Sequence, residues 1–448
     1  MLASLAQALL PALLIALSFP GTTQGDIAWY SAAYSLTSAT FVLPSGRLGD
    51  LFGHRGVFVI GYVWFALWSL LAGIAPYSSS GGTAYFCFAR AMQGVGPALL
   101  VPNGLAMLGR AYAGEGMMKR KRVVMCLFGA CAPMGFVVGG IMSCLVADGG
   151  RWWWGFWILA AVCVVLAVGS WAVLPRREGG RKGENGRIWT RLDGNGMLLG
   201  VTGLVLFNFS FTQAPQAGWT TPYIYFLLIL GALFIIAFVW YERAMATYPL
   251  IPISAMTAQT TFVLACTATG WASFSIWIYY TVYLLENLRG WSPLPTSVSL
   301  APAPVTGLTA SLLAGWLMGK VGAHWVMLIS MGAFFVGSLL MATAPVRQMY
   351  WGNTFWAILI MPFVSASVFS TLSSHERMAK GAERGWYLKC CCCCCCASCC
   401  YPFYPSRGGR YLCNKHTSVT SLQDSLNAFG AFFFRCSGGL SRCVRGPP

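Results

Sequence analysis

Long apolar runs separated by short polar loops fill most of this chain. A helix that crosses a membrane needs about 20 mostly apolar residues, and runs near that length recur along the chain. They predict twelve membrane-spanning helices, at Leu2–Phe19, Ile27–Leu43, Gly56–Ala75, Thr83–Leu108, Val123–Ala147, Trp152–Leu174, Met197–Thr212, Pro222–Trp240, Thr261–Leu285, Leu294–Met318, Trp325–Ala344 and Trp351–Leu372.

The first run, Leu2–Phe19, has two interpretations. Its length also fits the apolar region of a signal peptide, but no basic leader precedes it. A chain with many spans can use its first span for targeting, so we expect a membrane span here.

Composition supports the membrane class. Hydrophobic residues make up 57% of the 448 positions and charged residues only 9%, which leaves too little polar surface for a soluble globule. The 29 Lys and Arg residues exceed the 12 Asp and Glu residues, but they lie between the apolar runs and form no single face. We therefore expect the lipid bilayer as a partner and no nucleic acid.

The basic residues also predict an orientation. If the N-terminus lies inside, the inner loops hold fifteen Lys and Arg residues and the outer loops hold three: Arg151, Arg289 and Arg347. Cytosolic loops carry such an excess of positive charge. The N-terminus and the decapeptide "GRLGDLFGHR" (Gly46–Arg55) are therefore expected on the cytosolic side.

This decapeptide has a weaker copy, "GWLMGKVGAH" (Gly315–His324), displaced by 269 residues. The same displacement carries the second, third and fourth spans onto the tenth, eleventh and twelfth. Many transporters consist of such repeats, with a substrate site between the two halves. The sequence therefore predicts two pseudo-repeated helical bundles.

The repeat divides the chain into five regions. A second bundle should have six spans, yet four are visible, so we expect this bundle to be incomplete. The predicted regions are an N-terminal six-span bundle (1–174), a basic cytosolic linker (175–193), two central extra spans (194–259), an incomplete C-terminal bundle (260–372) and a cysteine-rich tail (373–448).

The tail has three interpretations. Twelve of the 18 cysteines follow residue 389, mostly in "KCCCCCCCASCC". They would suit palmitoylation, soft-metal binding, or low-complexity translation of an intron or a shifted reading frame. We favour the last, because it also explains the missing spans. The other six cysteines lie singly in apolar runs, so we expect no disulfide framework, no metal site and no cofactor.

Three motifs resemble those of the major facilitator superfamily. They are the loop "GRLGDLFGHR", the fourth-span stretch "ARAMQGVGPALLVPNGLAMLG" (Ala89–Gly109) and the fifth-span stretch "GACAPMGFVVGG" (Gly129–Gly140). With two central extra spans, the chain resembles the fungal 14-span drug:proton antiporter branch, and within it the aminotriazole-resistance, boron-export and low-affinity ammonium transporter group. The resemblance implies about 14 spans, of which 12 are visible. It also implies a monomer in the plasma membrane, with the vacuolar membrane as the alternative.

The loop motif predicts a latch at the cytosolic gate, formed by Gly46, Asp50, Gly53 and Arg55. We expect Gly46 to allow a close helix approach and Asp50 to pair with Arg55 across a tight turn at Gly53. The resemblance implies that Asp50 also meets the fifth span of the second half, which is missing here. The alternative is a solvated turn with no gating role.

Arg90 lies within an apolar run, away from its ends, where ionisable residues are costly and usually functional. The resemblance implies that it relays protons or lines the cavity, together with Gln93, Gly94 and Gly96. The alternative is an Arg90 side chain that snorkels outward to the membrane surface.

The fifth-span motif predicts a bent, closely packed helix through Gly129, Pro133, Gly135, Gly139 and Gly140. In the antiporter interpretation these residues set the geometry of alternating access. Structural packing without a coupling role is the alternative. Polar and aromatic candidates for a substrate cavity are Asn103, Asn208, Gln213, Trp271, Trp277 and Tyr280.

The sequence thus predicts a transmembrane transporter that exports small molecules or drugs in exchange for protons. No acidic residue lies in the middle of a predicted span, so an uncoupled facilitator of ammonium or boric acid remains open. A non-transporting sensor or an inactive truncated transporter is the alternative from another class. The four histidines are scattered and no nucleophile elbow appears, so we do not expect an enzyme.

Overall fold

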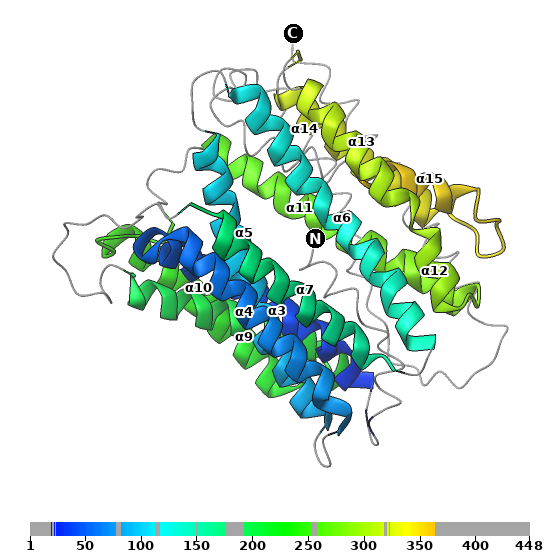
Figure 1. Cartoon of the computed structure of the whole chain (residues 1–448). Helices are drawn as coiled ribbons and strands as arrows, with labels where there is room; N and C mark the ends of the chain where they lie inside the picture. Colours follow the sequence, from blue (N-terminus) through cyan, green and yellow to red (C-terminus); the bar gives the residue numbers. More distant parts are fainter. Residues whose placement is uncertain are drawn as a thin grey trace, which may run out of the picture.

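The computed structural model describes residues 19, 22, 24–77, 82–112, 117–148, 151–175, 192–251, 258–317, 320–321 and 323–362, and its regular elements are helical (Figure 1). The helices are α3 (Gln24–Phe52), α4 (His54–Ile74), η1 (Ala75–Tyr77), α5 (Gly82–Ala111), α6 (Met118–Asp148), α7 (Trp153–Val173), α9 (Gly194–Ala217), α10 (Pro222–Ala244), α11 (Ala258–Tyr283), η3 (Leu284–Leu288), α12 (Pro293–Ser299), α13 (Pro302–Leu317), α14 (Ala323–Ala342) and α15 (Asn353–Ile360).

Eight stretches of helix within these residues combine the length and the apolar character that a membrane span requires. Helices α3 and α5 are not among the eight, although they are 29 and 30 residues long. Both are rich in Gly, Ser, Thr and other small or polar residues, which lowers their hydropathy. The predicted all-α membrane class is confirmed. The first predicted span up to residue 18 and the tail from residue 373 lie outside the described residues.

The predicted tenth span, Leu294–Met318, is divided in two. Helix α12 ends at Ser299 and α13 begins at Pro302. Proline lacks a backbone N–H and its ring clashes with the preceding turn, so a continuous helix through Pro302 is disfavoured. The predicted twelfth span is described as a helix over Asn353–Ile360.

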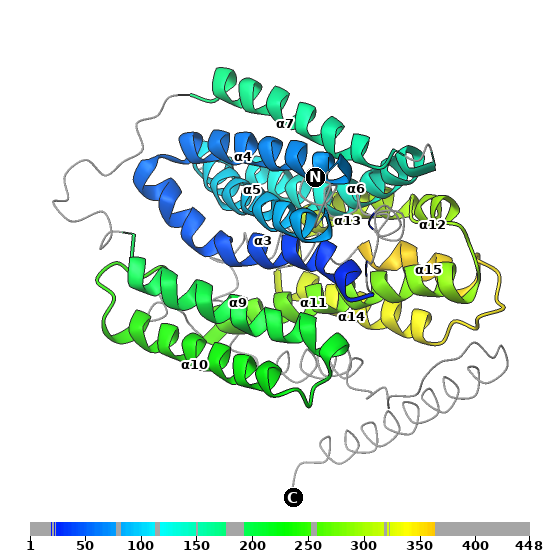
Figure 2. The same ribbon diagram turned by 90° about the horizontal axis from the view of Figure 1, so that it is seen from below.

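Helices α3, α4, α5 and α7 form one packed group, in which α5 contacts both α3 and α4, and α4 contacts α7. The α9–α10 hairpin lies against α3 on the side away from α7 (Figure 2). On this side Trp29 Nε1 donates to Gln213 Oε1 at 2.8 Å, and the Trp29 and Phe209 rings lie 5.1 Å apart. The two central spans are therefore attached to the first half through α3.

Helix α6 packs mainly against α12 and α13, beside which it lies in both views (Figures 1 and 2). Val137 of α6 shares a buried cluster with Leu300 and Ala303. Cys144 Sγ lies 3.3 Å from Ser297 Oγ. The helix with the predicted antiporter motif thus contacts the second half, and the division into bundles at residue 174 remains a prediction.

The helix boundaries agree with the internal repeat. A shift of α4 by 269 residues gives 323–343, and α14 spans Ala323–Ala342. The same shift of α3 gives 293–321, which α12 and α13 cover from Pro293 to Leu317.

Candidate gate and transport site

Helix α5 carries two polar centres at different depths. Arg90 and Gln93 form the first and Asn103 belongs to the second, and all three side chains are fully buried. Thirteen residues separate Arg90 from Asn103, which is about 20 Å along a helix. The first centre therefore lies well inside the span, and the second lies near the turn between α3 and α4.

Arg90 occupies the interior of the α3, α4, α5 and α7 group. Its Nε donates to the Tyr30 carbonyl at 3.1 Å, and its Nη1 donates to Gln93 Oε1. The guanidinium carbon lies 4.5 Å from the Tyr34 ring centroid and 5.7 Å from that of Phe156, so aromatic faces stabilise its charge. The snorkelling alternative is wrong, because this side chain is inside the helix group.

Two features of Arg90 are unusual for a buried cation. No carboxylate forms an ion pair with it among the described residues, and its Nη2 has no hydrogen-bond partner. Gln93 continues the network, because its Nε2 donates to Ser69 Oγ at 2.6 Å. A buried cation without a counter-ion costs stability, so function explains its presence better than packing does.

The glycines of the same motif bring the neighbouring helices close to Arg90. A Cβ atom at Gly94 would collide with the Tyr34 carbonyl of α3. At Gly96 a Cβ atom would lie 2.6 Å from that of Phe65 in α4. Gly94 and Gly96 therefore act through helix packing, and their predicted part in a proton relay stays a prediction.

The α3–α4 turn needs glycine at one position. Gly53 has φ = +93°, a backbone conformation that other residues rarely adopt, and its N–H donates to the Gly49 carbonyl at 2.9 Å. The expected tight turn at Gly53 is confirmed. It places His54 at the start of α4, where the imidazole is buried against α5.

Asn103 fixes the proton position on His54. Its Nδ2 donates to the Leu99 carbonyl at 2.7 Å and to the Ser45 carbonyl at 3.3 Å, so its Oδ1 acts as an acceptor. His54 Nδ1, 2.8 Å from this oxygen, must therefore carry a proton. Asn103 was predicted as a cavity residue, and the structure places it at the turn instead.

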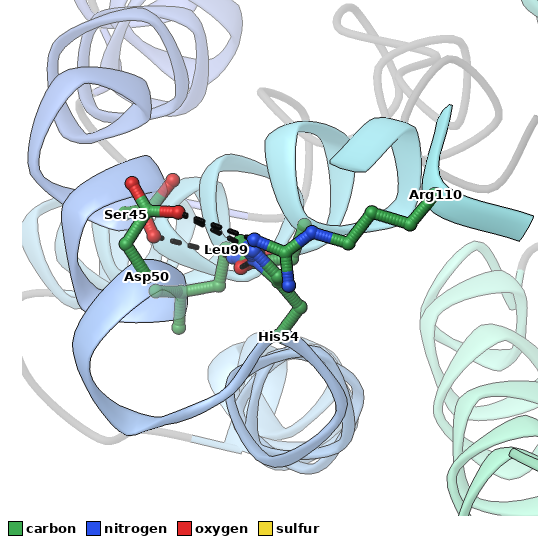
Figure 3. Close-up of polar contacts among 6 residues, drawn as sticks. Ser45, Asp50, His54, Leu99 and Arg110 are labelled. Atoms are coloured by element: carbon green, nitrogen blue, oxygen red, sulfur yellow. Dashed lines mark hydrogen bonds and ion pairs between the residues drawn. The ribbon is translucent and has the colours of Figure 1, made fainter. Parts of the chain in front are cut away.

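The other ring nitrogen of His54 faces a carboxylate. His54 Nε2 lies 3.4 Å from Asp50 Oδ1, and Arg110 Nη2 lies 3.6 Å from the same oxygen (Figure 3). Because Nδ1 is already protonated, a proton on Nε2 as well would make His54 a cation and the contact an ion pair. Asp50 is thus bound from α4 and from the end of α5.

The expected Asp50–Arg55 pair is wrong. Arg55 instead donates through Nη2 to the Trp171 carbonyl near the end of α7. The first turn of α4 directs His54 towards Asp50 and Arg55 to the opposite side. The contact of Asp50 with His54 and the contact of Arg55 with the Trp171 carbonyl still join helix ends near this turn. A latch role for the motif therefore remains a prediction, with these partners in place of an Asp50–Arg55 pair.

The expected close approach at Gly46 is also wrong. A Cβ atom added to Gly46 would meet no described atom within 4 Å. Gly49 is the closely packed glycine, because a Cβ atom there would collide with Asn103 and His54. The glycine that packs against the polar network is therefore Gly49, three positions after Gly46 in α3.

The remaining cavity candidates do not come together in one site. Gln213 binds Trp29, Asn208 is exposed on α9, and Trp277 is buried among α11, α14 and α15 side chains. Trp271 contacts the Phe274 ring at 5.8 Å, and the Tyr280 side chain is exposed.

The fifth-span glycines lie in α6 as expected. Gly129, Gly135 and Gly139 are buried, and a Cβ atom at Gly140 would lie 3.4 Å from Ser297 Oγ of α12. Pro133 lies within the same helix. This motif therefore belongs to the contact between α6 and the second half, and its role in alternating access remains a prediction.

Sequence reasoning missed several partners in these two centres. Ser45 lies one helical turn before Gly49 and donates to the Ala98 carbonyl at 2.6 Å. The sequence offered two signals of a polar face. These were the spacing between Ser45 and Asp50 and the spacing between Asp50 and His54. Arg110 had been counted only as a basic loop residue, because the contact depends on where α5 ends relative to α3.

The paired helix–turn–helix units and the buried polar centres define a multi-pass membrane protein of the transporter class. The Major Facilitator Superfamily model matches residues 1–375. The chain belongs to the major facilitator superfamily.

Two relatives and one solved structure are similar to it. The low affinity ammonium transporter of Saccharomyces cerevisiae is 45% identical, over 81% of this chain and 69% of that protein. The efflux pump terJ of Aspergillus terreus is 43% identical, over 77% of this chain and 65% of that protein. The proton:xylose symporter XylE, bound to 6-bromo-6-deoxy-D-glucose, aligns with a TM-score of 0.52 at 12% identity, covering 90% of this chain and 93% of that one. The last similarity shows the fold alone.

The chain thus spans about two thirds of the length of these fungal relatives. Membership of the family makes this chain a transmembrane transporter. The transported solute and its coupling to protons are matters of proposal.

Proposed function

We propose that this transmembrane transporter exports small molecules across the plasma membrane in exchange for protons, by alternating access. In the proposed orientation the N-terminus and the α3–α4 turn face the cytosol. The Asp50 contacts with His54 and Arg110 hold the ends of α3, α4 and α5 together while this side is closed. The α6 contact with α12 and α13 is the hinge surface between the halves.

The observation that carries this proposal is the buried, uncompensated Arg90. A fixed positive charge in a low-dielectric interior repels a cation at the same depth and attracts anionic or carbonyl groups. Its Nη2 hydrogen atoms lack an acceptor, so a solute or a carboxylate that moves during transport can supply one. Neutral or anionic solutes therefore suit this interior better than ammonium ions do.

The second candidate is a facilitator of ammonia or boric acid. The 45% identity to a low affinity ammonium transporter favours it, and a neutral solute would not be repelled by Arg90. This candidate differs from the first in one measurable property, since its flux should persist in vesicles without a proton gradient, where ammonia is not trapped as ammonium. A sensor without transport would show no flux at all.

The test uses the full chain in lipid vesicles with an acidic interior. Radiolabelled aminotriazole and methylammonium serve as probes, with and without a protonophore. Proton-coupled export predicts aminotriazole accumulation that the protonophore abolishes. We expect Arg90→Gln to reduce this accumulation at least about tenfold, because one buried hydrogen-bonded charge is commonly worth more than 1.4 kcal/mol.

Arg151→Gln is the matched control, because Arg151 is exposed outside the helices and should leave transport unchanged. Methylammonium entry into vesicles without a pH gradient, unchanged by the protonophore, would favour the facilitator. Equal transport by the wild type and Arg90→Gln would contradict the role of Arg90.

A further inference from the structure

Two buried carboxyl groups lie at the base of the α9–α10 hairpin. Asp193 precedes α9 with φ = +54° and accepts the Gly196 N–H at 3.3 Å through Oδ1. Glu242 lies in the last turn of α10. Their side chains are almost entirely buried, since the residues are 4% and 5% exposed.

The two carboxyl groups face each other. Asp193 Oδ2 and Glu242 Oε1 lie on the same side of Gly196, where an added Cβ atom would meet both oxygens. Asp193 Oδ2 is shielded from solvent and has no hydrogen-bond donor among the described residues. A proton between the groups would supply that donor, whereas two ionised carboxylates would repel each other.

The helix ends assign this proton mainly to Glu242. Asp193 lies at the N-terminus of α9, where the helix dipole stabilises negative charge. Glu242 lies at the C-terminus of α10, where the dipole disfavours it. Glu242 is therefore the better proton carrier and Asp193 the better acceptor.

A proton fits this site better than a metal cation does. Leu250 N–H and Ile251 N–H donate to the two Glu242 oxygens at 3.3 Å each, so positive hydrogen atoms already occupy that side. Hard cations need six or more oxygen ligands. No group of three metal-ligating side chains occurs in the described part of the chain.

The charged and titratable neighbours of the pair come from α10, from the following segment and from α3. Arg243 and Tyr241 are the neighbours on α10, Tyr248 lies in the following segment, and Arg47 approaches from α3. Arg243 is exposed, whereas both carboxyl groups are buried. The Arg47 guanidinium carbon lies 5.8 Å from the Tyr248 ring centroid.

We propose that Asp193 and Glu242 share one proton, and that this proton fixes the segment 245–251 between α10 and α3. Loss of the proton to water leaves two buried negative charges and no donor for Asp193 Oδ2. The segment then opens to admit water, and Tyr248 moves away from Arg47. Because Arg47 lies three residues before Asp50, the proton site is connected to the α3–α4 turn.

The pair would provide a proton-binding position at the end of a span, in a chain whose predicted spans have no acidic residue in the middle. A role in transport coupling rests on the proposed function. The existence of the shared proton does not, since it follows from the geometry of the carboxyl pair. The two can therefore be tested separately.

The test follows the purified full chain in detergent as the pH is raised. Infrared difference spectra should show the loss of one protonated-carboxyl C=O band that Glu242→Gln lacks at every pH. Amide hydrogen exchange in residues 245–251, corrected for its intrinsic pH dependence, should rise about tenfold or more over the same interval in the wild type.

Glu242→Gln keeps an N–H donor for Asp193 without a titrating proton, so exchange in the segment should stay slow and independent of pH. Asp193→Asn removes the second carboxyl and should also abolish the pH response. Glu286→Gln is the control, because Glu286 has no carboxyl neighbour among the described residues and both signals should persist.

A band that survives in Glu242→Gln, or an equal rise in exchange in all variants, would overturn the proposal. Vesicle transport is measured on the same proteins. If the wild type moves neither probe but keeps both pH signals, the proposed function fails and the shared proton stands. If transport is proton-coupled but both pH signals are missing, the shared proton fails and the proposed function stands.

Discussion

The α3–α4 turn and the α13–α14 turn, 269 residues apart, have the same helix–turn–helix form but different interiors. In the first turn Ser45 and His54 belong to a buried polar network with Asn103. The positions equivalent to Ser45 and His54 in the second turn are Ala314 and Ala323. There Ala314 packs with Val326 and Leu317 in an apolar cluster.

The charged residues differ in the same way. Asp50 binds His54 and Arg110, whereas its equivalent in the repeat is Gly319. In the described part of the second turn, Lys320 Nζ lies 4.1 Å from the Trp316 ring centroid. Because the repeat has alanine at the positions of Ser45 and His54, we expect that the polar network of the first turn is not required for folding. We infer that it serves the gate.

The largest expected effect is on Asn103. Asn103→Leu keeps the side-chain volume but leaves the His54 Nδ1 proton without an acceptor inside the protein. A buried unsatisfied donor costs about 1–3 kcal/mol, so thermal unfolding of the purified chain should occur several degrees lower. Transport should fall as well, because the imidazole loses the contact that orients it towards Asp50.

The matched control lies in the second turn. Ser311 of α13 is buried and donates only to the Gly307 carbonyl of its own helix, at 2.7 Å. Ser311→Ala should therefore shift unfolding by less than about 1 kcal/mol. If Asn103→Leu and Ser311→Ala destabilise the protein equally, the polar network contributes no more to stability than a single buried hydroxyl does.

Asp50→Asn should affect transport more than stability. The Asp50 side chain is 52% exposed, and exposed ion pairs contribute only about 0–1 kcal/mol. Unfolding should therefore change little, while the closed state of the gate loses the carboxylate that faces His54 and Arg110. We expect the rate of aminotriazole transport in vesicles to change at least about threefold, the equivalent of about 0.7 kcal/mol.

A double-mutant cycle identifies the partner that matters. If Arg110 acts through Asp50, Asp50→Asn with Arg110→Gln should change transport no more than Asp50→Asn alone. Additive effects of the two substitutions would show that Arg110 acts independently of Asp50. His54 would then be the partner of Asp50.

The fold was more predictable from the sequence than the contacts of the site. Apolar runs indicate spans directly, and the predicted eleventh span, Trp325–Ala344, differs from α14 by two residues at each end. The fourth-span motif also predicted that Arg90 and Gln93 lie on the same helix face, and the structure places both side chains in the interior. The partner of Asp50 was not predictable, because His54 and Arg55 are adjacent and only the start of α4 decides which one faces α3. The Asp193–Glu242 pair was missed because each residue lies at a span end, and sequence distance does not show that a hairpin closes there.

The smallest expected effect belongs to the second turn. Lys320→Met removes the contact with Trp316. Such a contact is worth about 0.5–1 kcal/mol at an exposed site. It joins two residues that are four positions apart, so it does not hold separate helices together. Thermal unfolding should shift by no more than this, and vesicle transport should stay within about twofold of the wild type. The comparison of the two turns depends on this result. A Lys320→Met variant that slows transport as much as Asp50→Asn would show that both turns gate the pathway, despite their different interiors. Unchanged transport would instead assign the gate to the turn that keeps its acid, its histidine and its buried asparagine.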